Sequence, residues 1–205
     1  MQESQLQRAL SSFLETSGLD QLSTILVHAW ERGRISFTQI QEIIVTDFED
    51  SLLLAIQQRL LIPARSIKGT LDWDDSVLLF EPGEIYRMPN VIRFLVKDSC
   101  QSGEWKPSDA IAIVFRDIGE PSWEIMPAVV GKMAEKAEHY IINAYDIIEA
   151  CTEFGLEARV DPMIAELKGT GVISPKLAVV EQGLRIRAPV YELNPSVATS
   201  VVPPH

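Results

Sequence analysis

The spacing of apolar residues switches between helical and extended patterns along the chain, and these switches predict where elements begin and end. Two helical stripes come first, within residues 6–14 and 22–30. Ser36 can then cap a short helix and Asp47 a second one, because each offers a side-chain oxygen to backbone N–H groups left open at a helix start. Pro63 ends that second helix and leaves residues 60–65 extended. The two stripes consist of Leu6, Leu10, Phe13 and Leu14, and of Leu22, Ile25, Leu26, Ala29 and Trp30.

A hairpin is predicted next, with strands at residues 76–80 and 85–88. Pro82 and Gly83 suit the two central positions of a type II turn, the second of which requires positive φ. Pro89 suits a first helical turn and leads into an apolar helix at residues 90–99. Residues 100–106 are typical of a linker, after which Pro107 or Ser108 starts another helix.

The second half repeats this order of elements. Residues 122–154 are helical in character, and Asn143 is the point at which this run can divide. Asp161 is the expected cap of a further helix, with Pro162 in its first turn and Gly169 or Gly171 at its exit. Residues 173–180 and 184–193 are then two strand candidates joined by a short turn that contains a glycine.

Residues 159–193 resemble the last helix and wing of winged-helix proteins, in which a helix, a glycine and a Val/Ile/Leu-Ile-Ser-Pro phrase lead into a hairpin ending in Tyr-x-Leu. Residues 19–88 are similar in layout. The resemblance implies a superfamily used for DNA recognition, for RNA polymerase and chromosome-associated assembly, and for protein docking. An acidic tandem of such domains is similar in outline to the kleisin-associated subunits of chromosome condensation complexes.

The expected fold is therefore mainly α with small β-hairpin wings (α+β), arranged as tandem winged-helix domains. We place a first domain at residues 1–88, a connecting helix and linker at 89–106, a second domain at 107–193 and an irregular tail at 194–205. A chain of 205 residues, 46% of them apolar, is large enough to bury two such cores. No apolar run reaches the roughly 20 residues that cross a membrane, and residues 1–10 lack a signal pattern, so we expect cytoplasmic residence and no membrane partner.

The formal net charge of −11 opposes the phosphate backbone of nucleic acid. Only residues 157–205 balance their acidic and basic residues, so DNA is a disfavoured partner and any DNA contact is expected there. Cys100 and Cys151 lack the spacing of a zinc site or disulfide framework, and we interpret both as buried thiols. We expect no metal and no cofactor.

Enzyme motifs such as GxSxG, the P-loop, GxGxxG and HExxH do not occur, so no catalytic residue is predicted. His28 adjoins an apolar stripe and is interpreted as a helix-surface residue. The acidic stretch of Asp72, Asp74 and Asp75 around Trp73 can bind a cation through carboxylates or form a solvated loop, and its spacing favours the loop.

The helix at residues 48–60 is the element whose residues bear most directly on DNA recognition, because in winged-helix proteins the outward side of the equivalent helix enters the major groove. At about 100° per residue the outward positions are Asp50, Ser51, Leu54, Gln57 and Gln58. Two glutamines can read adenine edges, but Asp50 would face phosphates and the face has no cation. We interpret Asp50, Leu54, Gln57 and Gln58 as candidates for contact with a protein.

A loose cluster of cations is predicted in the second domain. Arg185 and Arg187 alternate along one strand and so share a face, where they can touch phosphates or an acidic partner, or simply discourage edge pairing. The cluster consists of Arg159, Lys168, Lys176, Arg185 and Arg187.

Two function classes follow. The first is a non-enzymatic protein-interaction or scaffold protein that docks on a partner protein or on itself, and the alternative is a DNA-binding transcriptional regulator that uses the C-terminal winged helix. An enzyme ranks third. A homo-oligomer, most simply a dimer, is expected, because Ala112 and Ile113 lie off the main stripe of their helix and residues 90–99 are apolar on several sides.

Overall fold

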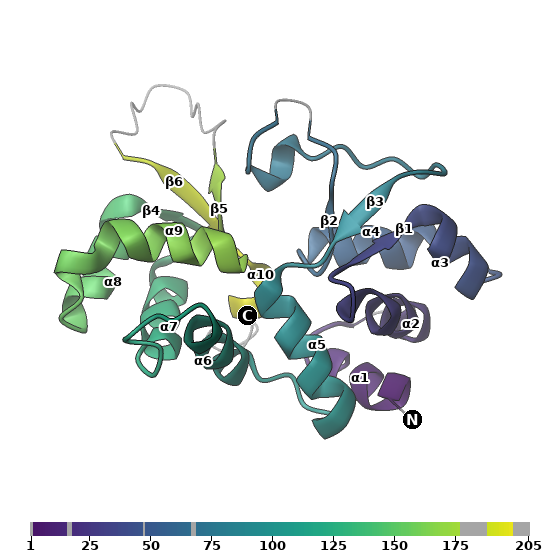
Figure 1. Ribbon diagram of the computed structural model, residues 1–205, viewed down its shortest axis with the longest axis horizontal. Helices are drawn as coiled ribbons and strands as arrows, with labels where there is room; N and C mark the ends of the chain where they lie inside the picture. Colours follow the sequence, from purple (N-terminus) through teal and green to yellow (C-terminus); the bar gives the residue numbers. More distant parts are fainter. Residues whose placement is uncertain (1, 16–17, 47, 67–68, 177–187, 199–205) are drawn as a thin grey trace. The chain divides into compact units, whose positions relative to one another are not determined.

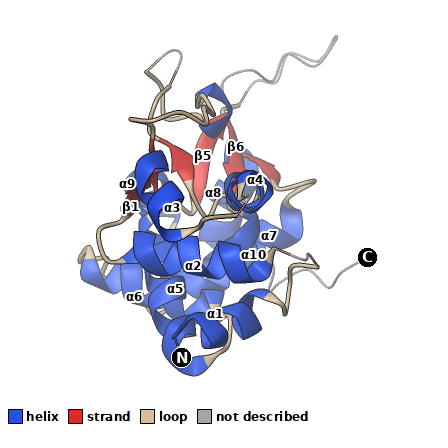
Figure 2. Ribbon diagram, turned by 90° about the vertical axis from the view of Figure 1, so that its right-hand side faces the viewer, coloured by secondary structure: helices blue, strands red, loops and turns tan. Residues whose placement is uncertain are grey.

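The computed structural model describes residues 2–15, 18–46, 48–66, 69–176 and 188–198. The chain divides into two compact units, one of residues 1–70 and 75–106 and one of residues 71–74 and 107–205. Helices dominate both, and each also holds one small antiparallel sheet of three strands (Figures 1 and 2). The expected class, mainly α with small β elements, is therefore confirmed.

The first unit places a three-stranded sheet among helices, with strand order β1-β3-β2. Helices α1, α2 and α5 pack against one another, and α4 packs on α2. Between β2 and β3 in the sequence comes a 3-10 turn, η1 (Trp73–Asp75), whose residues 73 and 74 belong to the second unit. The elements are α1 (Gln2–Leu10), α2 (Leu19–Trp30), β1 (Arg34–Ser36), α3 (Phe37–Ile43), α4 (Glu49–Gln57), β2 (Ile62–Pro63), β3 (Ile85–Arg87) and α5 (Asn90–Ser102).

The predicted apolar stripes supply the buried faces of α1 and α2, although α1 ends at Leu10, before Phe13 and Leu14. Leu6, Leu10, Leu22, Ile25 and Leu26 are all fully buried. The predicted cap of α3 is confirmed as a capping box, because the Ser36 hydroxyl accepts from the Gln39 N–H at 3.2 Å and the Gln39 side chain accepts from the Ser36 N–H at 2.9 Å. Asp47, the other predicted cap, lies outside the described residues.

The predicted strand at residues 76–80 is wrong. β3 already pairs with β1 on one side and with β2 on the other, so no ladder position is left for a hairpin partner. Residues 76 and 77 instead lie beside residues 65 and 66, where Ser76 forms a single bridge with Ser66 and the Val77 N–H donates to the Arg65 carbonyl at 2.9 Å. The Tyr86 hydroxyl donates to the Leu79 carbonyl at 2.5 Å. The turn before β3 is as predicted: Gly83 has φ +98°, and the Glu84 N–H donates to the Glu81 carbonyl at 3.2 Å.

The second unit has the same sheet order, β4-β6-β5. Helices α6 and α7 pack together, and α8 packs on α7. The elements are α6 (Pro107–Asp117), α7 (Met126–Lys136), β4 (Ile141–Asn143), α8 (Ala144–Glu153), the 3-10 turn η2 (Glu157–Arg159), α9 (Val160–Thr170), β5 (Ile173–Lys176), β6 (Val190–Leu193) and α10 (Pro195–Ala198).

Three sequence-based expectations for the second unit need correction. The run at residues 122–154 is interrupted by strand β4, although Asn143 does divide it by capping α8 through the Asp146 N–H at 3.1 Å. Asp161 lies inside the first turn of α9 and is not its cap. The expected irregular tail contains α10, whose residues are buried. The remaining parts of the two predicted strands, residues 177–187, lie outside the described residues.

The two units share residues as well as layout at the centre of each sheet. In the first unit Tyr86 pairs with Ile35 on one side and with Pro63 on the other. In the second, Tyr191 pairs with Ile142 and with Pro175 in the same arrangement. Each first strand also runs directly into a helix capped by its last residue, Ser36 or Asn143. The chain thus contains one structural pattern twice.

We expect Gly83→Val to destabilise the first unit by about 1–2 kcal/mol, since a β-branched residue resists the left-handed region. A Cβ at Gly83 would meet no atom within 4 Å, so the cost lies in the backbone and not in a clash. Urea unfolding of the intact chain measures it.

Gly131→Ala is the matched control, because Gly131 lies inside α7, has no positive φ and also has open space around its Cα. This change should stabilise the chain by about 0.5–1 kcal/mol. Equal stability of wild type and Gly83→Val would show that the turn adopts another form in solution.

Candidate interaction surfaces

The outward face of α4 differs from the predicted one by a rotation about the helix axis. Ser51 is buried and its hydroxyl donates to the Gly18 carbonyl at 3.1 Å and the Gln21 side-chain carbonyl at 3.0 Å. Leu53, which is not among the predicted outward positions, is 38% exposed. Because a short hydroxyl side chain can be buried once it is hydrogen-bonded, polarity alone assigned Ser51 to the wrong side.

The exposed stripe of α4 is formed by Asp50, Leu53, Leu54 and Gln57, spaced as i, i+3, i+4 and i+7. Leu54 and the adjoining Gln58 are half-buried, whereas Asp50 and Gln57 are exposed. No lysine or arginine occurs in α4. This stripe therefore offers an acid, an amide and two leucines to a partner.

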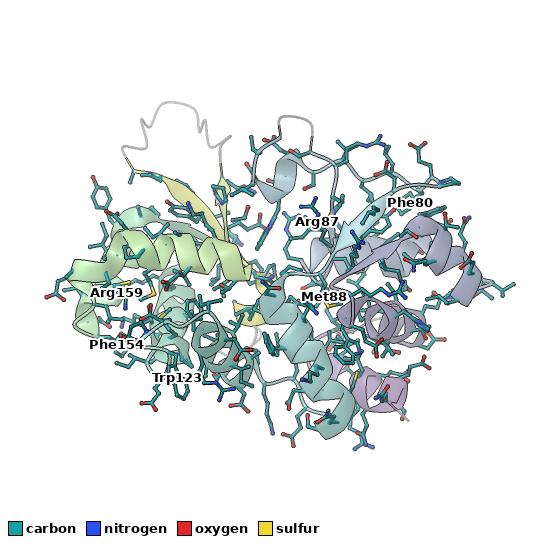
Figure 3. The ribbon with its side chains drawn as sticks, viewed as in Figure 1. Phe80, Arg87, Met88, Trp123, Phe154 and Arg159 are labelled. Atoms are coloured by element: carbon teal, nitrogen blue, oxygen red, sulfur yellow. The ribbon has the colours of Figure 1, made fainter. Side chains whose placement is uncertain are left out.

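Arg159 of the predicted cation cluster is held inside the second unit (Figure 3). Its Nη1 donates to Glu120 Oε1 at 3.0 Å, and its Nη2 lies 2.9 Å from Glu120 Oε2 and 3.7 Å from Glu166 Oε1. The Glu120 side chain is fully buried and also accepts from the Ser122 N–H at 2.8 Å. Arg159 thus neutralises a buried carboxylate.

The other predicted cations do not form one positive patch with it among the described residues. Lys176 pairs with Asp74, and its Nζ lies 3.6 Å from Glu192 Oε2. Lys168 is half-buried on α9, whose exposed positions include Asp161 and Ala165. Arg185 and Arg187 lie outside the described residues. The charges of Arg159 and Lys176 are therefore compensated by carboxylates of the second unit.

Glu166 has a raised pKa because it is desolvated, and because it shares a hydrogen bond with Glu120, while Arg159 acts in the opposite direction. The neutral Glu166 carboxyl therefore favours the folded state. Its contribution to the free energy of unfolding is complete at pH values below the ordinary pKa of a glutamate, and it is lost as the pH rises through the raised pKa of Glu166.

The Glu166→Gln variant cannot ionise at this position, so it should not lose this stability at higher pH. The difference in free energy of unfolding between the variant and wild type should therefore shift in favour of the variant as pH rises through the Glu166 pKa. Urea titrations between about pH 4 and pH 8 would measure it. Glu149→Gln is the control of opposite sign: a hydrogen bond from Lys136 lowers the Glu149 pKa, so the carboxylate stabilises at higher pH and this variant should lose stability there. Parallel curves for Glu166→Gln and wild type would contradict the assignment.

The acidic stretch around Trp73 is largely buried and hydrogen-bonded, which corrects the solvated-loop interpretation. Asp72 and Asp75 are buried, and the Thr70 hydroxyl donates to Asp75 at 2.6 Å. The Ser174 hydroxyl donates to the Leu71 carbonyl at 2.9 Å and accepts from the Trp73 N–H at 3.0 Å. Within the described residues, no group of three His, Cys, Asp or Glu side chains is placed to hold a metal ion.

Both cysteines are buried, as predicted. Burial raises the pKa of Cys100 to about 11 and also raises that of Cys151. Since the thiolate is the reactive form, neither thiol is suited to nucleophilic chemistry at neutral pH.

A groove in the first unit was not predicted from the sequence. It has a volume of about 360 Å³ and lies between α2, β1 and α3. A second recess of about 250 Å³ shares Arg32, Ile35 and Gln39 with it and extends along β1 to Ile85. His28, interpreted as a surface residue, lines the groove. Its other lining residues are Val27, Glu31, Arg32, Ile35, Gln39, Glu42 and Ile43.

An exposed aromatic region marks the turn into β4 and the start of α8. Tyr140 and Tyr145 are 42% and 63% exposed, and Ile148 is 41% exposed. His139 and Tyr140 have φ values of +50° and +65°, and Glu138 and Ile141 exchange two backbone hydrogen bonds across them. This is the geometry of a type I′ turn formed without glycine.

No helix in the described part of the chain has the length and apolar character needed to span a membrane. A protein-family model matches residues 5–202, and the chain belongs to that family. No curated protein and no solved structure matches the chain. The match therefore includes residues of both units.

Proposed function

We propose that this family member is a non-enzymatic protein-interaction or scaffold protein, built on tandem winged-helix domains and resident in the cytoplasm. The order of elements supports the fold. In each unit a helix, a strand, two helices and two strands follow one another, and the last strand lies between the other two. This is the layout of a winged helix, with α4 and α9 in the position of the helix that reads DNA.

The observation that carries protein docking is the exposed stripe of α4. A helix that enters the major groove needs cations beside the phosphates, which supply most of the affinity for duplex DNA. The stripe instead has Asp50 and two leucines that are half-buried or exposed. Complete burial of a leucine side chain contributes about 1.5–3 kcal/mol, so Leu53 and Leu54 favour contact with a protein surface.

The second unit adds little support for DNA binding in its described residues. Arg159 and Lys176 are engaged with carboxylates of the same unit. The alternative, a DNA-binding regulator, therefore rests on Lys168, Arg185 and Arg187.

Leu53→Glu combined with Leu54→Glu is expected to abolish docking, whether the partner is another protein or a second copy of the chain. Sedimentation at micromolar concentration detects self-association above the monomer mass of 22.9 kDa. Quantitative mass spectrometry of proteins that co-purify from the native cell detects a different partner.

Ile118→Glu combined with Ile125→Glu is the matched control, since both isoleucines are exposed on the second unit, at 48% and 38%. The control should keep every association that wild type shows, and melting temperatures verify that both variants fold. If wild type is monomeric without a co-purifying partner, or if the two double variants behave alike, docking through α4 is wrong.

Random duplex DNA is expected to bind the intact protein weakly at physiological salt. If binding does occur, Arg185→Ala with Arg187→Ala should remove most of it. The slope of the logarithm of the binding constant against the logarithm of salt concentration should become shallower by up to about 2, one for each lost phosphate contact. Fluorescence anisotropy across a salt series measures both. Tight binding that the double variant loses would place the DNA-regulator hypothesis first, whereas equally tight binding by both proteins would exclude these arginines.

A further inference from the structure

The outer edge of β1 has backbone groups that point away from the sheet. The Phe37 N–H donates to the Glu84 carbonyl, and the Met88 N–H donates to the Gly33 carbonyl. Because hydrogen-bonded and non-hydrogen-bonded pairs alternate in an antiparallel ladder, Ile35 faces β3 and both backbone groups of Arg34 face outward. In the part of the chain that the structure describes, the Arg34 N–H and carbonyl have no hydrogen-bond partner.

The equivalent edge in the second unit is covered. There the Ala144 N–H donates to the Pro189 carbonyl and the Leu193 N–H to the Tyr140 carbonyl, so Ile141 occupies the position of Arg34 and faces outward. Its N–H donates to the Glu138 carbonyl at 2.8 Å, and its carbonyl accepts from the Glu138 N–H at 3.0 Å. A single antiparallel residue thus completes the edge of β4, and the edge of β1 has no such residue among those described.

The space beside the open edge is lined for an extended chain. The two recesses share Arg32, Ile35 and Gln39 and lie beside β1. Val27, Ile35 and Ile43 give the larger one an apolar part. Glu31 and Glu42 also line it, and Arg34 does not. Arg32 and Arg34 are the charged residues that line the recess nearer to Ile85. Neither makes an ion pair with any residue of the described part, in a chain whose net charge is −11.

We propose that the outer edge of β1 binds an extended acidic segment of a partner protein as an added antiparallel strand. Residue positions in such a strand alternate between the two faces of the sheet. Acidic side chains opposite Arg34 then lie beside Arg32 and Arg34, and apolar ones between them lie over Ile35 and the apolar part of the groove. This surface does not include α4, so the two docking proposals fail or survive separately.

A terminally blocked heptapeptide of alternating valine and glutamate is the probe. Saturating peptide should slow hydrogen exchange of the Arg34 amide by about tenfold or more, because that N–H gains a backbone acceptor. Nuclear magnetic resonance of the intact ¹⁵N-labelled chain measures both the exchange and the affinity.

Two N-methylated peptides test the backbone pairing without altering the protein. In an added strand the glutamate opposite Arg34 directs its N–H toward β1, whereas the neighbouring valines direct theirs away. N-methylation of the glutamates should therefore weaken binding by about tenfold or more, and N-methylation of the valines should leave it nearly unchanged.

Arg32→Glu with Arg34→Glu should also weaken binding by about tenfold or more, since both charge-assisted contacts are lost. Arg8→Glu with Lys97→Glu is the control, because it makes the same charge change at exposed positions of α1 and α5 that do not line the groove. The proposal is overturned if millimolar peptide does not bind, if the Arg34 amide exchanges equally fast with peptide bound, or if both methylated peptides bind like the parent.

Discussion

Arg159→Ala is expected to lower the free energy of unfolding of the second unit by about 3 kcal/mol. Removing one partner of a buried ion pair costs about 3–5 kcal/mol because the other charge stays desolvated. Glu120 would be that charge: its side chain is fully buried, and both of its oxygens face the guanidinium group at 2.9–3.0 Å. The lower end of the range applies because the Arg159 side chain is 33% exposed and water can partly replace it.

Two further variants separate the ion pair from a general effect of losing an arginine. Arg116→Ala removes an exposed arginine of the same unit, whose Nε lies 3.9 Å from Asp117, and should cost less than about 1 kcal/mol. Glu120→Gln combined with Arg159→Met should recover much of the lost stability, because no uncompensated charge is then buried. A loss in Arg159→Ala no larger than that in Arg116→Ala would contradict this role of Glu120.

Tyr86→Ala should destabilise the first unit by about 3–5 kcal/mol, the range for deleting a large buried aromatic side chain. Tyr86 is fully buried at the centre of the sheet, between Ile35 and Pro63. Tyr86→Phe keeps the ring and loses only the hydrogen bond to the Leu79 carbonyl, so about 1 kcal/mol is expected. Urea unfolding monitored by hydrogen exchange of amides within residues 18–46, which belong to the first unit, measures the loss of stability in both variants.

The same hydroxyl gives a signature at high pH. Burial, with a smaller contribution from Glu84, raises the Tyr86 pKa to about 12 from its ordinary value of 10.0. Its neutral form thus contributes stability below the ordinary pKa that is lost as pH rises through about 12. Tyr86→Phe should be less sensitive to pH in this range. Equal alkaline sensitivity of the two proteins would show that another group controls it.

Local signals were readable from the sequence. The cap at Ser36 and the positive-φ turn at Gly83 depend on residues within a few positions of each other, and both are present. Strands β1 and β4 were missed because each has only three residues and exists through pairing with β3 or β6, which are distant in sequence. Ile141 and Ile142 therefore extended an apparently helical run, since periodicity cannot distinguish a short buried strand from a helix.

For the candidate surfaces too, features set by neighbouring residues were predictable from the sequence, and features set by residues distant in sequence were not. Spacing placed Asp50, Leu54 and Gln57 on one side of a helix, as the structure has them, but it could not anticipate that Gly18 and Gln21 would bury Ser51. The sequence near Arg159 does not reveal its ion pair, because the partner Glu120 lies 39 residues earlier. The groove beside β1 depends on how two helices flank a strand, and no single stretch of sequence encodes it.

Pro63 and Pro175 have a consequence for aggregation. Each lies opposite a central tyrosine on an edge strand, at a position whose N–H would point away from the sheet, so the proline ring removes an outward donor without disturbing the ladder. Fibre-like growth through strand addition needs two receptive edges on every molecule. Proline interrupts the β2 and β5 edges, and Glu138 covers the β4 edge, so β1 is the one receptive edge among those described. Strand addition through these edges can therefore join molecules in pairs but cannot propagate into a polymer.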